Sequence, residues 1–145
     1  MDTDDYTYTM PMNDGEVERA LRENEVGVLS LSGEGDAYAI PVAYHYADRT
    51  LFFRLGEHEG SEKIRFVDAT DRACFLLYDY ESEMDSWSVL ARGPISRVPP
   101  DESPDRIEID DAYVALRVFD EPIEELDATL YRLAVEEWSG RRTAE

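Results

Sequence analysis

The sequence predicts a mainly β fold: a small antiparallel β-barrel of six strands with three peripheral helices. Six segments rich in apolar and aromatic residues have the length and composition of strands, and most of them are joined by turns. Direct connections of this kind favour an antiparallel barrel over a parallel sheet that alternates with helices. The length of 145 residues fits one domain, and we expect a single domain over residues 1–145.

Three segments have helical patterns. At the start of the first, Asn13 or Asp14 can cap the helix, and Val17 and Leu21 then form an apolar stripe at helical spacing. Ser61 is a suitable N-cap for a second, shorter helix. The expected helices cover about residues 13–24, 61–67 and 110–119.

Turn residues separate the expected strands. Residues 33–36 are typical of a tight hairpin turn, and residues 47–49 form the next turn. Pro41 lies in the middle of the second strand and cannot donate a ladder hydrogen bond, so this strand should lie at an edge or be irregular there. Gly93 and Pro94 interrupt the fifth strand. The expected strands cover about residues 26–31, 37–46, 51–55, 73–78, 87–98 and 128–137.

Acidic residues dominate the charge of the chain. There are 34 Asp and Glu against 14 Lys and Arg, which gives a formal net charge of -20. A negative field of this size repels nucleic acids and anionic membrane surfaces, so we expect no nucleic-acid or membrane partner. No apolar run is long enough to span a bilayer, and the acidic start MDTDDYTYTM is unlike a signal peptide. These features predict a cytoplasmic protein.

Lys63 is the only lysine among the 14 basic residues. An acidic, lysine-poor surface is similar to that of proteins from organisms that balance external salt with internal KCl, so we expect a halophilic source. Molar salt screens the repulsion between carboxylates that would otherwise destabilise the folded state. A flexible ammonium is a suitable ligand for phosphate, which indicates a function for Lys63. The alternative is an ordinary exposed lysine.

Several common catalytic and metal-binding motifs are absent from the sequence. It contains no Gly-rich phosphate loop, no strand–GxGxxG–helix unit and no paired-cysteine site, and no serine lies in a nucleophile-elbow context. His45 and His58 are the only histidines and have no cysteine near them in sequence, so no metal site is expected. The single cysteine, Cys74, lies in an apolar run, which favours a buried inert thiol over a catalytic one.

Three segments in order carry the functional signal: AIPVAY at residues 39–44, FFRL at 52–55 followed by GSEK at 60–63, and WSVLARG at 87–93. With this order and spacing, the sequence resembles the pyridoxamine 5'-phosphate oxidase-like FMN-binding split-barrel superfamily, closest to its small nitroimidazole-reductase-like branch. The late motif WSGRR at 138–142 adds to the resemblance. The resemblance implies a six-stranded antiparallel split barrel, and a homodimer with FMN at the subunit interface.

The resemblance implies that the backbone of Pro41, Val42 and Ala43 lies along the flavin ring. An irregular, proline-bearing strand suits this role, because its unpaired N–H and C=O groups can meet the polar edge of the ring. The alternative is an edge-strand proline without a ligand.

The resemblance also implies a phosphate site between the end of the next strand and the short helix that follows it. Arg54, Ser61 and Lys63 would bind the phosphate there, because a guanidinium, an ammonium and the N–H groups of a helix N-terminus all favour it. For Arg54 and Lys63 the alternative is ion pairing at the surface.

Trp87 and Ser88 begin the strand that, by resemblance, approaches the flavin, often from the partner subunit. The indole of Trp87 could supply a flat apolar wall, or it could belong to the core or the dimer interface. Trp138, Gly140 and Arg141 could reach the cofactor or the interface.

Together, these expectations predict an FMN-dependent oxidoreductase of unknown substrate, similar to nitro-group or quinone reductases. The hypothesis allows a nicotinamide electron donor and a deazaflavin in place of FMN. No catalytic residue is assigned, although Tyr44, His45 and Tyr46 are candidates. Full pyridoxamine phosphate oxidases carry an arginine and a lysine around the second-strand motif, and neither occurs at residues 40–45, so that oxidation is not expected. The alternative is a flavin- or ligand-binding module without turnover.

Overall fold

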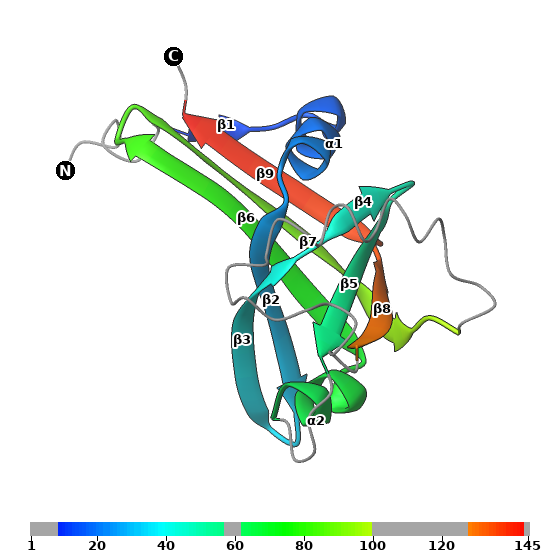
Figure 1. Cartoon of the computed structure of the whole chain (residues 1–145). Helices are drawn as coiled ribbons and strands as arrows, with labels where there is room; N and C mark the ends of the chain where they lie inside the picture. Colours follow the sequence, from blue (N-terminus) through cyan, green and yellow to red (C-terminus); the bar gives the residue numbers. More distant parts are fainter. Residues whose placement is uncertain (1–8, 57–61, 100–127, 144–145) are drawn as a thin grey trace, which may run out of the picture.

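The computed structural model describes residues 9–56, 62–99 and 128–143, and these residues form nine strands and two helices (Figure 1). Antiparallel pairing joins all the described strands, so the mainly β, antiparallel fold predicted from the sequence is confirmed. The elements are β1 (Thr9–Pro11), α1 (Asp14–Glu23), β2 (Val26–Gly33), β3 (Asp36–Ala43), β4 (His45–Ala47), β5 (Thr50–Gly56), α2 (Glu62–Ala69), β6 (Arg72–Ser82), β7 (Asp85–Arg97), β8 (Ala128–Ala134) and β9 (Glu137–Thr143).

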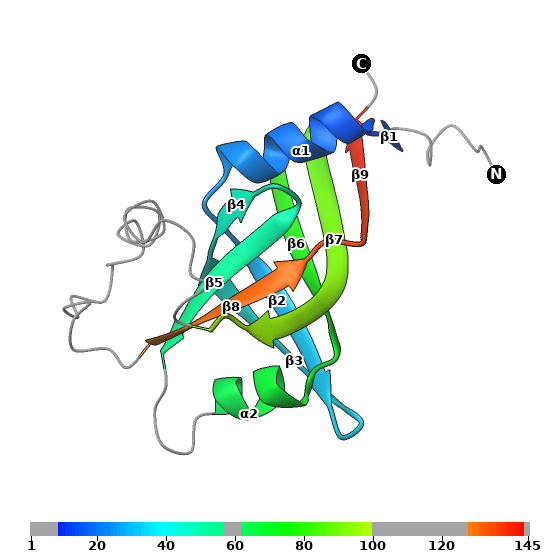
Figure 2. The same ribbon diagram turned by 90° about the vertical axis from the view of Figure 1, so that its right-hand side faces the viewer.

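The strands close into a barrel through the continuity of β3 with β4 and through a change of partner along β7. The pairing order is β3-β2-β6-β7-β8-β5-β4, and β3 and β4 are successive parts of one stretch of chain, so the order returns to its start. The long strand β7 curves strongly (Figure 2) and pairs with β9 through its first part and with β8 through its last. Gly93 lies where β7 changes partner, and a Cβ there would collide with the Ala134 carbonyl.

The strand count differs from the six expected, for reasons that lie in the backbone. The expected strand 37–46 divides at Tyr44, whose N–H donates to the Glu25 carbonyl instead of to a neighbouring strand (3.0 Å). The expected strand 128–137 ends early, because the Val135 N–H donates to Arg49 and the chain then enters β9. The strands β1 and β9 had no counterpart among the expected elements. The predicted helix 110–119 and the Ser61 cap lie outside the described residues.

The two helices close opposite ends of the barrel (Figure 2). In α1, Asn13 and Glu16 form the reciprocal hydrogen bonds of a capping box, and Val17 and Leu21 are fully buried in the core, as predicted. In α2, the buried Phe66 stacks on Tyr38 of β3 with a centroid separation of 5.0 Å. Neither described helix has the length and apolar character needed to cross a membrane.

Candidate functional site

The first part of the expected site lies on β3. Among the described strands, β3 pairs only with β2, so its second edge has no strand partner, in agreement with the edge position predicted from Pro41. Pro41 is exposed, whereas the Val42 side chain lies in the core at 5% exposure and Ala43 is buried at 2%. Any ligand beside this segment would therefore meet the Pro41 ring and the backbone of residues 41–43 rather than the Val42 side chain.

Arg54 lies on the outer face of β5. Its neighbours Phe53 and Leu55 are buried in the barrel, and Arg54, half-buried, faces the other way. The register places Arg54 opposite Leu130 and Phe52 opposite Arg132, so the two arginines are diagonal neighbours on one face. Arg132 was not selected in the sequence analysis. The signal that could have found it is the alternation of Arg132 with Tyr131 and Leu133, which are both buried.

Lys63 lies in the first turn of α2, the helix that follows β5 in sequence. It is half-buried and makes no ion pair within the part of the chain that the structure describes. The adjacent carboxylate of Glu62 lies 3.7 Å from the guanidinium of Arg65, which also faces Glu34. Among the described residues, the Glu62 carboxylate therefore pairs with Arg65 and not with Lys63. Ser61, the third expected phosphate ligand, lies outside the described residues.

Trp87 and Ser88 lie on opposite faces of β7, since neighbouring side chains in a strand alternate. Trp87 packs against the core and is opposite Asp79 and Arg142, and Arg142 donates a hydrogen bond to Glu16 of α1, so this face of β7 is turned toward α1. Ser88 lies on the outer face, opposite Tyr78 and Arg141. The structure therefore does not bring both side chains to one ligand surface.

The outer face of the sheet connects Pro41 with Ser88. Cross-strand pairing aligns Pro41, Val28, Leu76 and Leu90 in one row over four strands, and Ser88 is two residues from Leu90. We call this surface the outer sheet face. Large apolar and aromatic side chains are exposed on or beside it, with Tyr78 at 64% and Tyr80 at 65% exposure.

The three candidate proton donors, Tyr44, His45 and Tyr46, differ in their access to the outer sheet face. The Tyr44 hydroxyl donates to the Leu21 carbonyl (2.7 Å), and burial, followed by the Glu25 carboxylate, raises its pKa far above the usual range. Burial also raises the pKa of Tyr46, whose hydroxyl donates to Glu18. Both tyrosines point into the barrel, whereas His45 alternates with them and lies on the outer side beside Phe52. Among the described residues, no group of three or more potential metal ligands occurs.

Comparison with known proteins identifies the family. Residues 13–142 match the family described as pyridoxamine 5'-phosphate oxidase. The chain belongs to this family. The match includes residues 39–44, 52–63, 87–93 and 138–142, the segments on which the resemblance was based.

Solved structures similar to this family member share its split-barrel fold. A FAD-binding protein from Mesorhizobium loti is 21% identical with a TM-score of 0.79, over 94% of this chain and 99% of that chain. The FAD binding protein from Mycobacterium smegmatis is 21% identical with a TM-score of 0.67, over 93% of this chain and 100% of that chain. The FAD and heme binding protein from Mycobacterium smegmatis is 15% identical with a TM-score of 0.71, over 95% and 74%. No curated protein matches the chain.

Proposed function

We propose that the protein binds FMN and acts as an FMN-dependent oxidoreductase, similar to nitro-group or quinone reductases. The observation that carries the proposal is Lys63, a half-buried ammonium that forms no ion pair with the described residues of a chain of net charge -20. Membership of the pyridoxamine 5'-phosphate oxidase family supports it. So does the likeness to structures of FAD-binding proteins, which favours a flavin as the class of cofactor.

The described residues fit a flavin mononucleotide. Arg54 and Lys63 flank the chain segment between β5 and α2, and with Ser61 they would hold the phosphate through charge-assisted hydrogen bonds. The open edge of β3 at residues 41–43 would hold the ring by backbone contacts. The rigid Pro41 would limit the movement of this backbone segment. When bound, the flavin supplies electron and hydride transfer, and the protein orients it and excludes water from one face.

A homodimer through the outer sheet face forms part of the proposal. Exposed aromatic side chains such as Tyr78 and Tyr80 are typical of surfaces that a partner covers. Pairing two copies through this face would bring Ser88 of a second copy toward the β3 edge of the first. Trp87 faces the α1 side and would not take part in such contact. A Tyr78→Asp variant should sediment as a monomer while the parent protein sediments as a dimer; equal sedimentation would contradict this interface.

The cofactor test is an absorption spectrum of the protein purified in molar KCl, where the screening length is about 3 Å or less. We expect flavin bands, and mass spectrometry of the released cofactor should give FMN rather than FAD or a deazaflavin. A Soret band would instead indicate haem and would overturn the proposal. Reduction by a nicotinamide and reoxidation by a nitroaromatic or quinone would indicate an enzyme. A retained flavin inert to both would indicate a binding module.

Two variants on the same helix test the phosphate site. Lys63→Ala should lose the flavin on desalting, because the phosphate dianion loses a direct cationic ligand. Arg65→Ala, two residues away, removes a guanidinium that pairs with Glu34 and Glu62 and should retain it. If both variants retain the flavin equally, Lys63 does not bind the phosphate.

A further inference from the structure

A second candidate site lies away from the proposed flavin residues, between α1, the turn from β4 to β5 and the start of β9. It is a groove with a volume of about 580 Å³, within the range of pockets that hold small organic ligands. Its lining contains none of the residues assigned to the flavin, and it includes Asp14, Glu18, Arg19, Arg22, Arg49 and Trp138.

A flat cationic surface forms one wall of this groove. The guanidinium of Arg49 lies over the Trp138 ring, with its central carbon 3.9 Å from the ring centroid. The indole is fixed in turn, because its Nε1–H donates to Asp14 (3.0 Å). Arg49 is exposed and makes no ion pair with the described residues, so its N–H donors face solvent. A stacked guanidinium of this kind can hold a second planar group and an anion at its edge.

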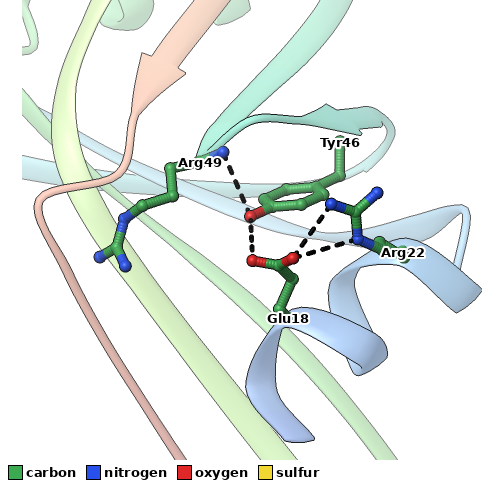
Figure 3. Close-up of polar contacts among 4 residues, drawn as sticks. All are labelled: Glu18, Arg22, Tyr46 and Arg49. Carbon is green, nitrogen blue, oxygen red and sulfur yellow. Dashed lines mark hydrogen bonds and ion pairs between the residues drawn. The ribbon is translucent and has the colours of Figure 1, made fainter. Parts of the chain in front are cut away.

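The backbone holds Arg49 in a conformation that an arginine rarely adopts. Asp48 and Arg49 have φ angles of 54° and 56°, and a two-residue turn of this type normally contains Asn-Gly or Asp-Gly. Tertiary contacts fix the conformation: the Tyr46 hydroxyl accepts from the Arg49 N–H (3.1 Å), as Figure 3 shows, and the Val135 N–H donates to the Arg49 carbonyl (2.9 Å). Backbone strain of this kind clusters at active sites and ligand-binding sites, which favours a ligand-binding role for Arg49.

The other charges of the groove compensate one another. Arg22 forms an ion pair with Glu18 (3.0 Å), as Figure 3 shows, and Arg19 pairs with Glu23 (3.0 Å). Asp14 accepts a hydrogen bond from the neutral indole of Trp138, and Arg49 forms no ion pair with the described carboxylates of the groove. Three arginines balance three carboxylates here, whereas the whole chain carries -20. The groove therefore suits an anion of single charge better than a polyphosphate.

We propose that this groove binds a planar aromatic monocarboxylate, independently of the flavin. Its ring lies against the exposed face of the Arg49 guanidinium, backed by Trp138, and its carboxylate is attracted by the positive charge of that guanidinium. Both contacts depend on Arg49, and the strained turn keeps that side chain over the indole.

Isothermal titration calorimetry with 2-naphthoate tests the proposal on the protein as purified. Uncharged 2-naphthamide and non-planar cyclohexanecarboxylate should each bind at least about tenfold more weakly, since each lacks one of the two contacts. A Trp87→Phe variant leaves Trp138 as the only tryptophan, and its fluorescence should be quenched by 2-naphthoate. No binding of 2-naphthoate, or equal binding of all three probes, would overturn the proposal.

The matched variants are Arg49→Gln and Arg65→Gln, because Arg65 is also stacked on an aromatic ring, that of Phe66 (4.7 Å). We expect at least about a tenfold loss of affinity in the first and none in the second. Arg49→Gly, which removes the strain, should remain folded and also lose binding. Lys63→Ala should bind 2-naphthoate normally, which separates a failure of this proposal from a failure of the flavin site. Unchanged affinity in both Arg49 variants would overturn the assignment.

Discussion

Two hairpin turns of this barrel have positive φ angles at both central residues, but they differ in the residue at the second central position. The β2–β3 turn uses Glu34 and Gly35 with φ angles of 54° and 78°, and the β4–β5 turn uses Asp48 and Arg49 with 54° and 56°. In the first turn the glycine adopts a positive φ without steric cost, and no atom lies within 4 Å of the position of a Cβ. In the second, the arginine is held by the Tyr46 hydroxyl, by Val135 and by the Trp138 ring.

The difference shows that one turn type can be encoded locally or imposed by the rest of the fold. The β2–β3 turn has a glutamate at its first positive-φ position and a glycine at its second, so the second position adopts this geometry without the steric cost of a Cβ. The β4–β5 turn has an arginine at its second positive-φ position, and contacts from Tyr46, Val135 and Trp138 hold it there. It should therefore respond to substitutions and pH changes that leave the first turn unaffected.

The largest effect is expected at alkaline pH, through Tyr44 and Tyr46 beside the β4–β5 turn. Both have a raised pKa in the folded protein, mainly from burial. Above the unfolded value of about 10, the unfolded chain releases protons that the folded chain retains, so the free energy of unfolding falls as pH rises. Urea unfolding at fixed KCl across this range measures the fall. It should be smaller in Tyr44→Phe, and an unchanged pH dependence in that variant would contradict the assignment.

Tyr46→Phe should lower the free energy of unfolding by about 1–2 kcal/mol at neutral pH, because the Arg49 N–H loses its acceptor. Urea denaturation measures this change. The control is Tyr38→Phe, since the Tyr38 hydroxyl makes no hydrogen bond with the described residues and its ring stack on Phe66 is retained, so stability should change little. Similar losses in the two variants would show that the hydroxyl does not support the turn.

Gly35→Ala should destabilise the protein by about 1 kcal/mol, because Cβ is disfavoured at a positive φ. The open space around Gly35 excludes a steric clash as an added cost. Urea denaturation would show a lower midpoint with an unchanged slope. A loss well above this value would mean that the turn has contacts beyond its own backbone.

The smallest effect is expected from Arg49→Gly, within about 0.5 kcal/mol of the parent, because relief of strain offsets the lost cation–π contact. In a Trp138→Leu background the contact is already absent, so the same change should stabilise the protein. The two differences in unfolding free energy form a double-mutant cycle. Equal differences would contradict the energetic coupling of Arg49 with Trp138.

Local patterns determined much of this protein. The apolar stripe and caps of α1, the glycine-containing turn at residues 33–36 and the edge position of Pro41 follow from spacing and backbone preference, and all occur as predicted. The ordered motifs also identified the family, which the match over residues 13–142 confirms. These features share one property: each depends on residues close together in the sequence, whose geometry is set by sterics and hydrogen bonding within a few positions.

Tertiary structure alone decided the rest. The break at Tyr44 and the separation of β8 from β9 depend on hydrogen bonds to Glu25 and Arg49, far away in sequence or across the barrel. Closure of the barrel decided which face of β7 points inward, so that Trp87 lies toward the core and Ser88 outside, and pairing of β5 with β8 put Arg132 beside Arg54. The stack of Arg49 on Trp138 joins residues 89 positions apart. Such contacts form only when the barrel closes, because pairing register, not local preference, determines which side chains meet.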